Sequence, residues 1–496
     1  MKSNLFKDLI IFEMANSHQG DVNHGINIIK KMGEIARKYN IKAAVKLQYR
    51  HYDTFIHPDY KERTDIKHIP RFMSTRLSDD EFNMMVKAVK DEGMITMSTP
   101  FDETSVDLCL KQDLDIIKIA SCSAKDWPLL EKVAVSQKPI IVSTGGLKID
   151  EIDDLYNFFI HRNCCFAILH CCALYPAPQS MLQMNIIDKL RNRYPNIPIG
   201  YSGHEDPNDK IIPSIAVAKN AEILERHVAL PTETISINSY SMTPEQADNW
   251  VKTIVDVREI CKFDKDKNIT NDELLSLESL SRGVYAKTKI KEGNFIKKSD
   301  VFFAMPYQTN QLKSGELKTG IIATKDYNIN DPIIEKPLIN KNKNTRTIIH
   351  EVKGMLNESG IILGENFQIE LSHHYGIEKF REVGCAIVSI INREYCKKLL
   401  IMLPNQKHPS HYHKLKEETF QVLYGDMELV LNDEQKTLNV GDIQTVKRMD
   451  WHSFSTTKGL IFEEVSTTHY RNDSFYEDSI IANLDPMERK TILEMW

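Results

Sequence analysis

Two histidines stand where a metal site could form. His204 closes the apolar run IPIGYSGH, and His227 closes the next such run, AEILERH, with a helix-like segment between them. Two parallel strands joined by a crossover helix would place both imidazoles at the same edge of a sheet. Such a pair can hold a divalent metal that keeps open positions for a substrate. The alternative at this point is two unrelated surface or helix-capping histidines.

The segment that must position them, Asp8 to Cys261, repeats one plan. Short β-branched runs alternate with segments of helical period such as Ile29-Met32-Ala36. Eight such units predict a closed parallel TIM (β/α)8 barrel. An open doubly wound sheet is the competitor, but nothing resembles the Gly-rich dinucleotide turn of that fold. Each run is apolar until its last residues, and the polar ends are Glu13, Lys46 with Gln48, Thr99, Lys118 with Ser121, Ser143 with Thr144, His170, His204 and His227.

In a barrel these polar ends converge on one face, where we expect the active site. Lys46 and Lys118 supply positive charge and the hydroxyls supply donors, which together suit a phosphate and a carboxylate. The two histidines suit a transition metal that acts as a Lewis acid on a carbonyl oxygen. Glu13 is placed to complete the metal shell or to act as a base. The alternative for the lysines is a structural ion pair inside the barrel mouth.

Composition excludes several classes of protein. A chain of 496 residues predicts about two to four domains, and its net charge of −6 argues against a nucleic-acid partner. No apolar stretch is long enough to span a membrane, and Asp8 and Glu13 interrupt the short apolar start, so no signal peptide is predicted. The nine cysteines lack CxxC spacing. The adjacent pairs Cys164-Cys165 and Cys171-Cys172 are predicted to be reduced core thiols of a cytoplasmic protein.

Two further domains are predicted beyond the barrel. The polar segments Lys262–Leu277 and Asn340–Asn344 are predicted linkers. Between them, RGVYAKTKIKEGNFIKKSDV and GIIATKDYNINDPIIEKPLI each follow the order strand, charged turn, strand, which predicts a compact pseudo-symmetric β domain. A domain this small either packs on another surface or stands alone on a tether. A helix-like run, IIHEVKGML, opens the last domain, and the three predicted domains span 1–265, 281–340 and 346–496.

A second cluster of metal-ligand residue types lies in the last domain. His411 and His413 alternate along a predicted strand and so share one face, Glu418 begins the next strand, Gly425 ends it at a turn, and His452 lies further on. This pattern resembles the cupin motif, which implies an all-β jelly-roll barrel. The three imidazoles and the carboxylate would hold a divalent metal, with zinc, manganese, iron and nickel left open. The alternative is a metal-free cupin used for dimer contacts.

The order of motifs in the barrel resembles a known family. FEMANSHQG, KLQ, STPFD, KIAS, STGG, LYPAP, IGYSGH and ERH look like the N-acetylneuraminate (sialic acid) synthase family, and ESLSRGVYAKTKIKEGNFIKKSDV looks like its small antifreeze-like domain, a β-clip fold. The resemblance covers about the first two-thirds of the chain. It implies that phosphoenolpyruvate adds through C3 to the open-chain aldehyde of an amino sugar, and that phosphate leaves by C–O cleavage. The product would be a 2-keto-3-deoxy sugar acid.

The resemblance also implies a role for each matched residue. His204 and His227 would bind the metal, typically manganese, with magnesium or cobalt as alternatives, and Glu13 would be the acid/base group beside it. The residues that would bind phosphoenolpyruvate are Lys46, Thr99, Lys118, Ser121, Ser143 and Ser202. Gln48 and Tyr175 would line the sugar pocket. The antifreeze-like domain would cover the barrel mouth of a neighbouring subunit in a domain-swapped homodimer and close the site against water.

Three positions depart from the family pattern on the sugar side. Ser123 replaces a glutamate that follows KIAS, Ile237 and Asn238 stand near the place of an aspartate that contacts the sugar, and Met305 replaces an arginine. We retain Asn238 as the candidate sugar contact in that loop. These departures predict that the acceptor is not plain N-acetylmannosamine but a modified or dideoxy amino sugar, or a sugar without the acetamido group.

Two roles are open for the cupin domain, and one alternative is open for the whole chain. The cupin resembles sugar isomerases and epimerases, so it could supply the aldose that the barrel uses. It could instead be a binding or oligomerisation module without chemistry. A non-catalytic sugar-acid binding protein is the alternative for the whole chain, and the retained lysines and histidines of the barrel argue against it.

Overall fold

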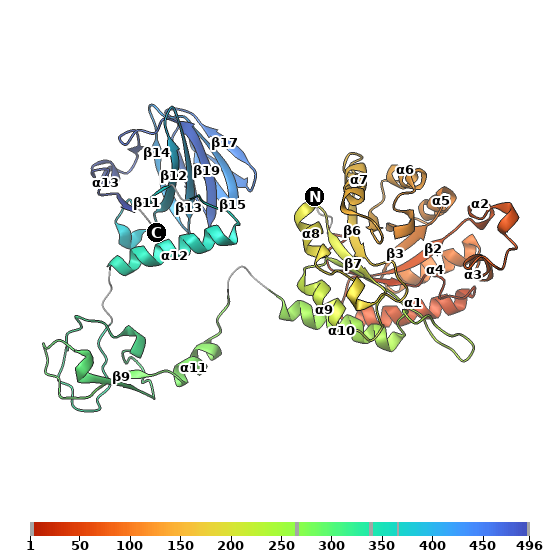
Figure 1. Cartoon of the computed structure of the whole chain (residues 1–496), viewed down its shortest axis with the longest axis horizontal. Coiled ribbons are helices and arrows are strands. Elements are labelled where there is room, and N and C mark those ends of the chain that lie inside the picture. Colours follow the sequence, from red (N-terminus) through yellow and green to blue (C-terminus); the bar gives the residue numbers. More distant parts are fainter. Residues whose placement is uncertain (1–3, 263–266, 337–340, 365–366, 494–496) are drawn as a thin grey trace. The chain divides into compact units, whose positions relative to one another are not determined.

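Eight parallel strands close into a barrel in the order β1-β2-β3-β4-β5-β6-β7-β8, which confirms the predicted TIM barrel (Figure 1). The computed structural model describes residues 4–262, 267–336, 341–364 and 367–493. The strands are β1 Leu9–Glu13, β2 Ala43–Tyr49, β3 Ile95–Pro100, β4 Ile116–Ile119, β5 Ile140–Ser143, β6 Phe166–Cys171, β7 Ile199–Gly203 and β8 Ile223–His227. The helices are α1 Val22–Lys38, α2 Tyr52–Phe55, α3 Ile69–Ser74, α4 Asp79–Asp91, α5 Glu103–Lys111, α6 Trp127–Val135, α7 Ile149–Ile160, α8 Ile186–Arg193, α9 Ile211–Ala218 and α10 Pro244–Ile260.

The barrel interior changes character along its axis. An apolar cluster fills the end where the strands begin, and its strand members are Leu9, Ile11, Ala44, Ile95, Met97, Ile116, Ile141, Ala167, Leu169 and Ile223. Successive side chains of a strand point to opposite faces, so every second residue points inward. The next inward positions after this cluster are Glu13, Lys46, Thr99, Lys118, Ser143, Cys171 and Glu225, all buried. The apolar plug therefore supports a polar layer at the carboxyl ends of the strands, where barrel enzymes place their sites.

The cysteines bear out the prediction only in part. All nine are free thiols. Cys171 ends β6 and is buried, but Cys165 is exposed and Cys164 is half-buried. The prediction of core thiols is therefore wrong for Cys165, which is exposed in the segment before β6, whereas Cys164 and Cys172 are half-buried and pack against the barrel core.

The chain forms two compact units, Met1–Asn268 and Ile269–Trp496. The domain ends predicted at residues 265, 340 and 496 lie outside the described residues, as does Asn340 of the second predicted linker. Both predicted linkers contain helix: α11 spans Asn271–Ser279, and α12 spans Lys341–Glu358. Thr270 caps α11 by accepting a hydrogen bond from the Glu273 backbone. No helix in the described parts of the chain is both long and apolar enough to cross a membrane.

The small domain between these helices is a reciprocal β structure. Strands β9 (Gly283–Ala286) and β10 (Val301–Ala304) pair antiparallel. The second half of the predicted repeat forms isolated bridges rather than named strands, so its strand prediction is wrong. The halves nevertheless exchange equivalent bonds: Ala286 N donates to Asp331 O, and Ala323 N donates to Asn294 O. This exchange supports the predicted pseudo-symmetry.

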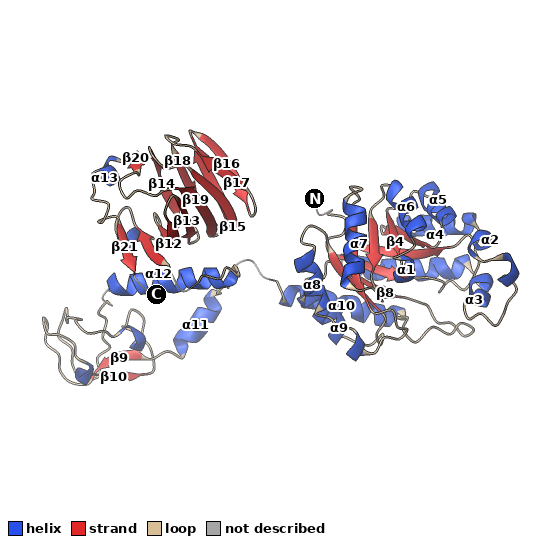
Figure 2. Cartoon of the chain, turned by 45° about the horizontal axis from the view of Figure 1, so that its top comes forward, coloured by secondary structure: helices blue, strands red, loops and turns tan. Residues whose placement is uncertain are grey.

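The last domain is one curled antiparallel sheet, as Figure 2 shows, and it confirms the predicted all-β cupin architecture. Its strands are β11 Gln368–Ser372, β12 Cys385–Asn392, β13 Tyr395–Met402, β14 Lys407–Tyr412, β15 Glu418–Leu431, β16 Glu434–Asn439, β17 Ile443–Val446, β18 His452–Ser455, β19 Leu460–Thr467, β20 Phe475–Tyr476 and β21 Lys490–Leu493, with the short helix α13 at Ser479–Ala482. The apolar face of α12 packs on the sheet through Ile348, Val352 and Leu356, which confirms the predicted opening helix.

Strand β15 is longer than predicted and joins the two halves of the curled sheet. Its first part pairs with β17 and β19, and its last part pairs with β16 and β18. Gly425 does not end the strand but lies inside it with φ +81°. A Cβ atom at Gly425 would lie 1.9 Å from Gly459 O, so the close approach of the two backbones requires glycine there.

Candidate active site and metal centre

Two lysines and one carboxylate form the centre of the polar layer in the barrel. Lys46 Nζ lies 2.8 Å and Lys118 Nζ lies 3.0 Å from the same atom, Glu225 Oε1. Ser202 Oγ donates to that oxygen at 2.9 Å, and Lys118 Nζ donates to Ser143 Oγ at 2.7 Å. Strands β2, β4, β5, β7 and β8 thus meet at one point. The structure brings together four residues predicted for the site, Lys46, Lys118, Ser143 and Ser202.

Electrostatics of this cluster follow from burial. Burial alone would raise the pKa of Glu225, but Lys118 and Lys46 hold it well below its usual range. Burial lowers the pKa of Lys46 to about 7, against the opposing effect of Glu225. Lys46 also pairs with Glu13, whose Oε1 accepts a hydrogen bond from Ala15 N at 2.7 Å. Glu225 therefore stays ionised and orders both ammonium groups.

Glu225 is the functional candidate that the sequence interpretation missed. Only His227 was selected from the run ending in ERH, although Glu225 lies two residues earlier on the same inward face. The period-two alternation of β8 could have identified it. Both lysines make an ion pair of the kind considered as the alternative, with Glu225 as the shared partner.

The hydroxyl groups differ in how they are used. Thr99 is buried in the polar layer, and Ser121 Oγ accepts a hydrogen bond from Gly145 N at 2.9 Å. Thr144 Oγ1 donates to Leu169 O at 3.0 Å, so that hydroxyl is engaged with the backbone of β6. The predicted donor function of Thr144 toward a ligand is therefore wrong.

The two barrel histidines face each other at the mouth. The His204 and His227 ring centroids are 5.3 Å apart. Burial lowers the pKa of His204 to about 4, and burial followed by the neighbouring His204 lowers the pKa of His227 well below its usual range. Both imidazoles are neutral at pH 7, which is the form that binds metals. Lys46 and Lys118 contribute to lowering the pKa of His204, and Glu13 is in register with both Lys46 and His227, so the lysines and the imidazoles lie near one another at the carboxyl ends of the strands.

Two tyrosines flank this pair. The Tyr175 ring centroid lies 4.2 Å from that of His204, and the Tyr240 ring centroid lies 5.1 Å from that of His227. Tyr175 was expected at the sugar pocket, and Tyr240 was missed. Asn238 is exposed in the same loop as Tyr240. Gln48 Oε1 accepts a hydrogen bond from Arg50 Nη1 at 3.1 Å, so a third cationic side chain lies next to Gln48.

His18, in the motif FEMANSHQG, leads to a prediction of pH-dependent stability. Its side chain is buried, and its Nδ1 accepts a hydrogen bond from Gly20 N at 3.1 Å, so the ring is neutral. Burial and the nearby Arg71 lower its pKa to about 4. Between pH 6.5 and 4 the unfolded chain binds more protons at His18 than the folded chain does, so the free energy of unfolding falls as the pH falls.

We expect His18 to account for about 3 kcal/mol of this loss between pH 6.5 and 4. Urea unfolding of the barrel at a series of pH values should show a shallower loss for His18→Gln than for the wild type. His57→Gln is the control, because His57 is exposed. Equal slopes for the wild type and His18→Gln would contradict the prediction.

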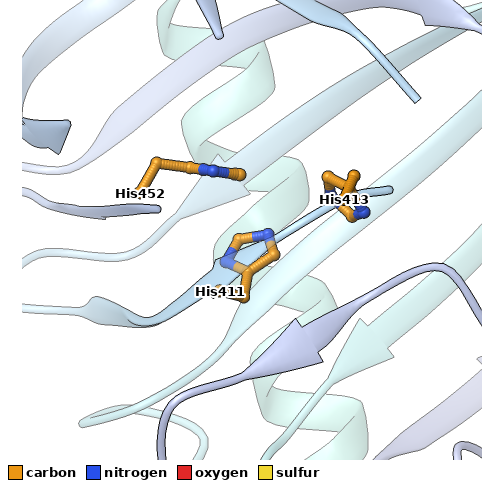
Figure 3. Close-up of side chains that lie close together, drawn as sticks. All are labelled: His411, His413 and His452. Carbon is orange, nitrogen blue, oxygen red and sulfur yellow. The ribbon is translucent and has the colours of Figure 1, made fainter. Parts of the chain in front are cut away.

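In the cupin domain, His411, His413 and His452 converge, as Figure 3 shows. One ring nitrogen from each lies within 4.8 Å of the others. Glu418 joins them, with Oε1 3.4 Å from His413 Nε2 and Oε2 3.2 Å from His452 Nε2. His413 lies one residue beyond β14, so the prediction that both histidines of the pair belong to one strand is wrong by that residue.

The histidine hydrogen bonds fit a metal. His411 Nδ1 faces Pro409 O at 3.0 Å, His413 Nδ1 faces Asp473 O at 2.5 Å, and His452 Nδ1 faces Asp450 O at 3.1 Å. A carbonyl only accepts, so each Nδ1 carries the proton and each Nε2 keeps a lone pair. His452 Nε2 and Glu418 Oε2 are buried without a hydrogen-bond partner in the described chain. These orphaned atoms are what a bound cation would satisfy.

Two residues that the sequence interpretation missed modify this centre. Lys416 pairs with Glu418 and, at 3.0 Å, with Glu464 Oε1. Burial would lower the pKa of Lys416, but Glu418 and Glu464 raise it, so it stays charged. The centre opens into a cavity of about 280 Å³ that also contains Tyr476 and Arg489. The cavity is near the lower end of the range for small-molecule sites.

Comparison with known proteins finds a family match for the barrel and another for the last domain. Residues 35–266 match the NeuB family, and residues 398–461 match the cupin domain family. The chain is 30% identical over 299 residues to an uncharacterized protein of Methanocaldococcus jannaschii, covering 60% of this chain and 84% of that one. It is 28% identical over 348 residues to N,N'-diacetyllegionaminic acid synthase of Campylobacter jejuni, covering 66% and 99%. It is 27% identical over 301 residues to N-acetylneuraminate-9-phosphate synthase of Homo sapiens, covering 58% and 80%.

A solved structure agrees with these sequences. Spore coat polysaccharide biosynthesis protein E, as the Chromobacterium violaceum structure is described, has 39% identity and a TM-score of 0.62, with 67% of this chain and 100% of that chain covered. The fold and these relatives define a transferase of the sialic acid synthase type, which forms a carbon–carbon bond from phosphoenolpyruvate. The chain belongs to the NeuB family and carries a cupin domain after the barrel. The family predicted from the sequence is confirmed.

Proposed function

We propose that the barrel joins C3 of phosphoenolpyruvate to the aldehyde carbon of an open-chain amino sugar. Water adds to C2 of the former enol, the C2–O bond to the phosphoryl group breaks, and inorganic phosphate leaves. The product is a 2-keto-3-deoxy sugar acid. The observation that carries this proposal is the placement of Lys46 and Lys118 at the same end of the barrel as the facing pair His204 and His227.

The lysines bind the carboxylate and the phosphate of phosphoenolpyruvate in this proposal. Hydroxyl donors complete the subsite, and they are Thr99, Ser121, Ser143 and Ser202. Glu225 is a positioning residue, because it holds both ammonium groups on one side of the cavity. The polar layer is buried, which strengthens each charge-assisted bond to the substrate.

The two neutral imidazoles, His204 and His227, hold a divalent metal in this proposal, with manganese first and magnesium or cobalt as alternatives. The metal supplies Lewis acidity to the carbonyl oxygen of the sugar. Glu13 is the acid/base group that holds or releases a proton near that oxygen. Tyr175, Gln48 and Asn238 contact the sugar, and we add Tyr240 because of its place beside His227.

The acceptor is a modified amino sugar in this proposal rather than plain N-acetylmannosamine. Ser123 is buried beside the site and offers a hydroxyl where related enzymes are expected to carry a carboxylate. Met305, in the small domain, is 54% exposed and offers no charge. The sugar side is thus chemically different from that of the family pattern, while the phosphoenolpyruvate side is intact.

Mass spectrometry of products tests the barrel function. The full chain is incubated with phosphoenolpyruvate and a panel of aldoses, with and without manganese, and inorganic phosphate is measured in parallel. We expect at least one aldose to gain the mass of a pyruvate unit in a metal-dependent manner. Absence of phosphate release with every aldose would refute the function, and fastest turnover of N-acetylmannosamine would refute the acceptor assignment.

For the cupin domain we propose metal-dependent isomerisation or epimerisation of the sugar that feeds the barrel. In either reaction a base removes a proton from the carbon beside the carbonyl and a proton returns to the neighbouring carbon or to the opposite face. The three-histidine centre opens into a polar cavity that also contains Lys416 and Glu464, charged groups outside the proposed metal set, which supports this proposal. A binding or oligomerisation module is the alternative. The metal is zinc, manganese, iron or nickel.

We also propose that the chain forms a domain-swapped homodimer in which the antifreeze-like small domain covers the barrel of its partner. The small domain has its own apolar core around Val284, Ile296 and Leu312, so it can dock as a unit. The barrel mouth needs a cover, because water competes for the reactive carbonyl. A monomer in sedimentation experiments at assay concentration would contradict this proposal.

A further inference from the structure

A third cationic residue extends the inward-facing row of β2. Lys46 and Gln48 occupy successive inward positions, and Arg50 follows at the same spacing just beyond the strand. At about 3.3 Å per residue, the Arg50 Cα lies about 13 Å along the chain from the Lys46 Cα. Arg50 therefore lies just past the carboxyl end of β2, beyond the lysine layer, and it also lines a cavity with Tyr52 and Ser105.

Aromatic faces clamp the Arg50 guanidinium. Its central carbon lies 3.6 Å from the Phe101 ring centroid and 4.1 Å from the Phe72 ring centroid. Phe101 lies one residue beyond the end of β3, and Phe72 lies on α3 in the long connection between β2 and α4. Stacking on both faces fixes the plane of the guanidinium. The N–H groups along its edge are then the part that can bind a ligand.

The N–H edge of Arg50 is only partly satisfied, with Tyr52 and Gln48 as its hydrogen-bond partners. Nη1 donates to Gln48 Oε1 at 3.1 Å, whereas Nε is buried without a hydrogen-bond partner in the described chain. No carboxylate in residues 4–262 makes an ion pair with Arg50. Asp102, the nearest acid that affects it, already accepts hydrogen bonds from His51 N and Ser105 N. A guanidinium has five N–H donors, and buried donors without acceptors cost about 1–3 kcal/mol each.

A second guanidinium lies on the same connection. Arg71 on α3 donates to Gln19 Oε1 at 2.8 Å and to Asn16 O at 3.3 Å, both in the loop after β1. Among the described residues it also makes no ion pair with a carboxylate. The outer part of the mouth therefore carries positive charge that the protein itself does not neutralise.

We propose that Arg50 is a specificity residue that binds an anionic group, a phosphate or a carboxylate, at the end of the acceptor sugar remote from the aldehyde. This inference rests on the proposed synthase function of the barrel. The aldehyde end belongs beside His204 and His227, and Gln48, which bonds Arg50, lies between the lysine layer and the outer mouth. The planar Arg50 guanidinium can donate two parallel N–H hydrogen bonds, and this geometry suits either anion.

The test uses matched aldoses that differ only at C6. Two configurations of a 2-acetamido aldohexose are each supplied with a C6 hydroxyl, a C6 phosphate or a C6 carboxylate, and phosphate release from phosphoenolpyruvate is followed with the full chain. Terminal phosphate of the acceptor is not released by the reaction, so the assay reports only the enol phosphate when the product is checked by mass. We expect kcat/KM to be at least about tenfold higher for an acidic acceptor than for its neutral counterpart.

The variants separate recognition from structure. Arg50→Gln should lower kcat/KM for the acidic acceptor by about a hundredfold, change that for the neutral acceptor by less than about threefold, and leave KM for phosphoenolpyruvate unchanged. Arg50→Lys keeps the charge but not the fork and should fall between them. Arg76→Gln is the control, because Arg76 is on the same connection but pairs with Asp53 at 3.1 Å. Thermal unfolding of each variant checks that the barrel is intact.

Each outcome decides the inference. A phosphate preference that disappears in Arg50→Gln supports it with phosphate as the anion, and a carboxylate preference that disappears supports it with carboxylate. Preference for the neutral acceptors, an equal loss for all acceptors, or a raised KM for phosphoenolpyruvate would overturn it while leaving the synthase function standing. Failure of the wild type to release phosphate with any aldose would overturn the synthase function itself.

Discussion

Lys118→Met is expected to reduce kcat/KM for phosphoenolpyruvate by about a thousandfold or more. Lys118 is 2% exposed and bonds both Glu225 and Ser143, so no other group can move into its place. Methionine fills a similar volume without the charge, which makes the loss electrostatic rather than steric. Steady-state phosphate release at varied phosphoenolpyruvate concentration measures the effect.

A double variant separates catalysis from stability. Lys118→Met leaves the buried Glu225 with one ammonium instead of two, which should lower the free energy of unfolding by about 3 kcal/mol. Lys118→Met combined with Glu225→Gln removes the unbalanced charge and should recover most of that stability without recovering activity. Lys125→Met is the control, because Lys125 pairs with Glu151 at an exposed site. Turnover by the double variant at more than about a tenth of the wild-type rate would refute the role of Lys118.

The barrel could be predicted because its signal repeats. Each strand is short, β-branched and apolar until its last residues, and the inward alternation that builds the plug also builds the polar layer above it. The sequence therefore predicts which residues share a face, such as Lys46 and Gln48. It does not predict which partners they meet, because Glu225 joins Lys46 and Lys118 only when β2, β4 and β8 close around one axis.

In the cupin domain, too, the sequence predicts the metal-ligand residues but not the partners that the fold brings to them. The motif predicted His411, His413, Glu418 and His452 as a cluster, because these four residues follow a known spacing. Lys416 comes from the loop before β15 and Glu464 from β19, and their pairing depends on how the sheet curls. The polar start of α12 was interpreted as a linker because helix ends are often polar and local composition does not distinguish them.

Gly425 illustrates a further limit of local patterns. A glycine after an apolar run predicts a turn, yet β15 continues through it for six residues. The reason is non-local: Gly459, on the neighbouring segment, approaches so closely that a Cβ atom would collide with its carbonyl oxygen. A positive φ then serves a bend within one long strand instead of ending it.

The second large effect is expected in the cupin domain. His411→Ala combined with His413→Ala removes two of the three imidazoles, and we expect the purified full chain to lose the metal of this centre, with affinity reduced by at least about a hundredfold. Metal content after dialysis, measured by elemental mass spectrometry, should fall by one equivalent relative to the wild type. The Nδ1 bonds to backbone carbonyls orient both rings toward the centre, so the double variant removes two pre-oriented ligands.

The same variant decides between the two roles of the cupin domain. If the domain isomerises or epimerises the sugar, the variant should fail to convert the precursor while the barrel still consumes phosphoenolpyruvate with the finished aldose at the wild-type rate. His373→Gln is the matched control, because His373 is a buried histidine of the same domain that bonds Thr491 Oγ1 at 2.9 Å outside the metal cluster. Glu418→Gln keeps all three imidazoles and leaves β14 unchanged. It should weaken metal binding, so it tests the effect of metal loss even if the double variant misfolds. Unchanged conversion of the precursor by a metal-free double variant would leave the domain as a binding or oligomerisation module, because a centre that can be emptied without effect supplies no chemistry.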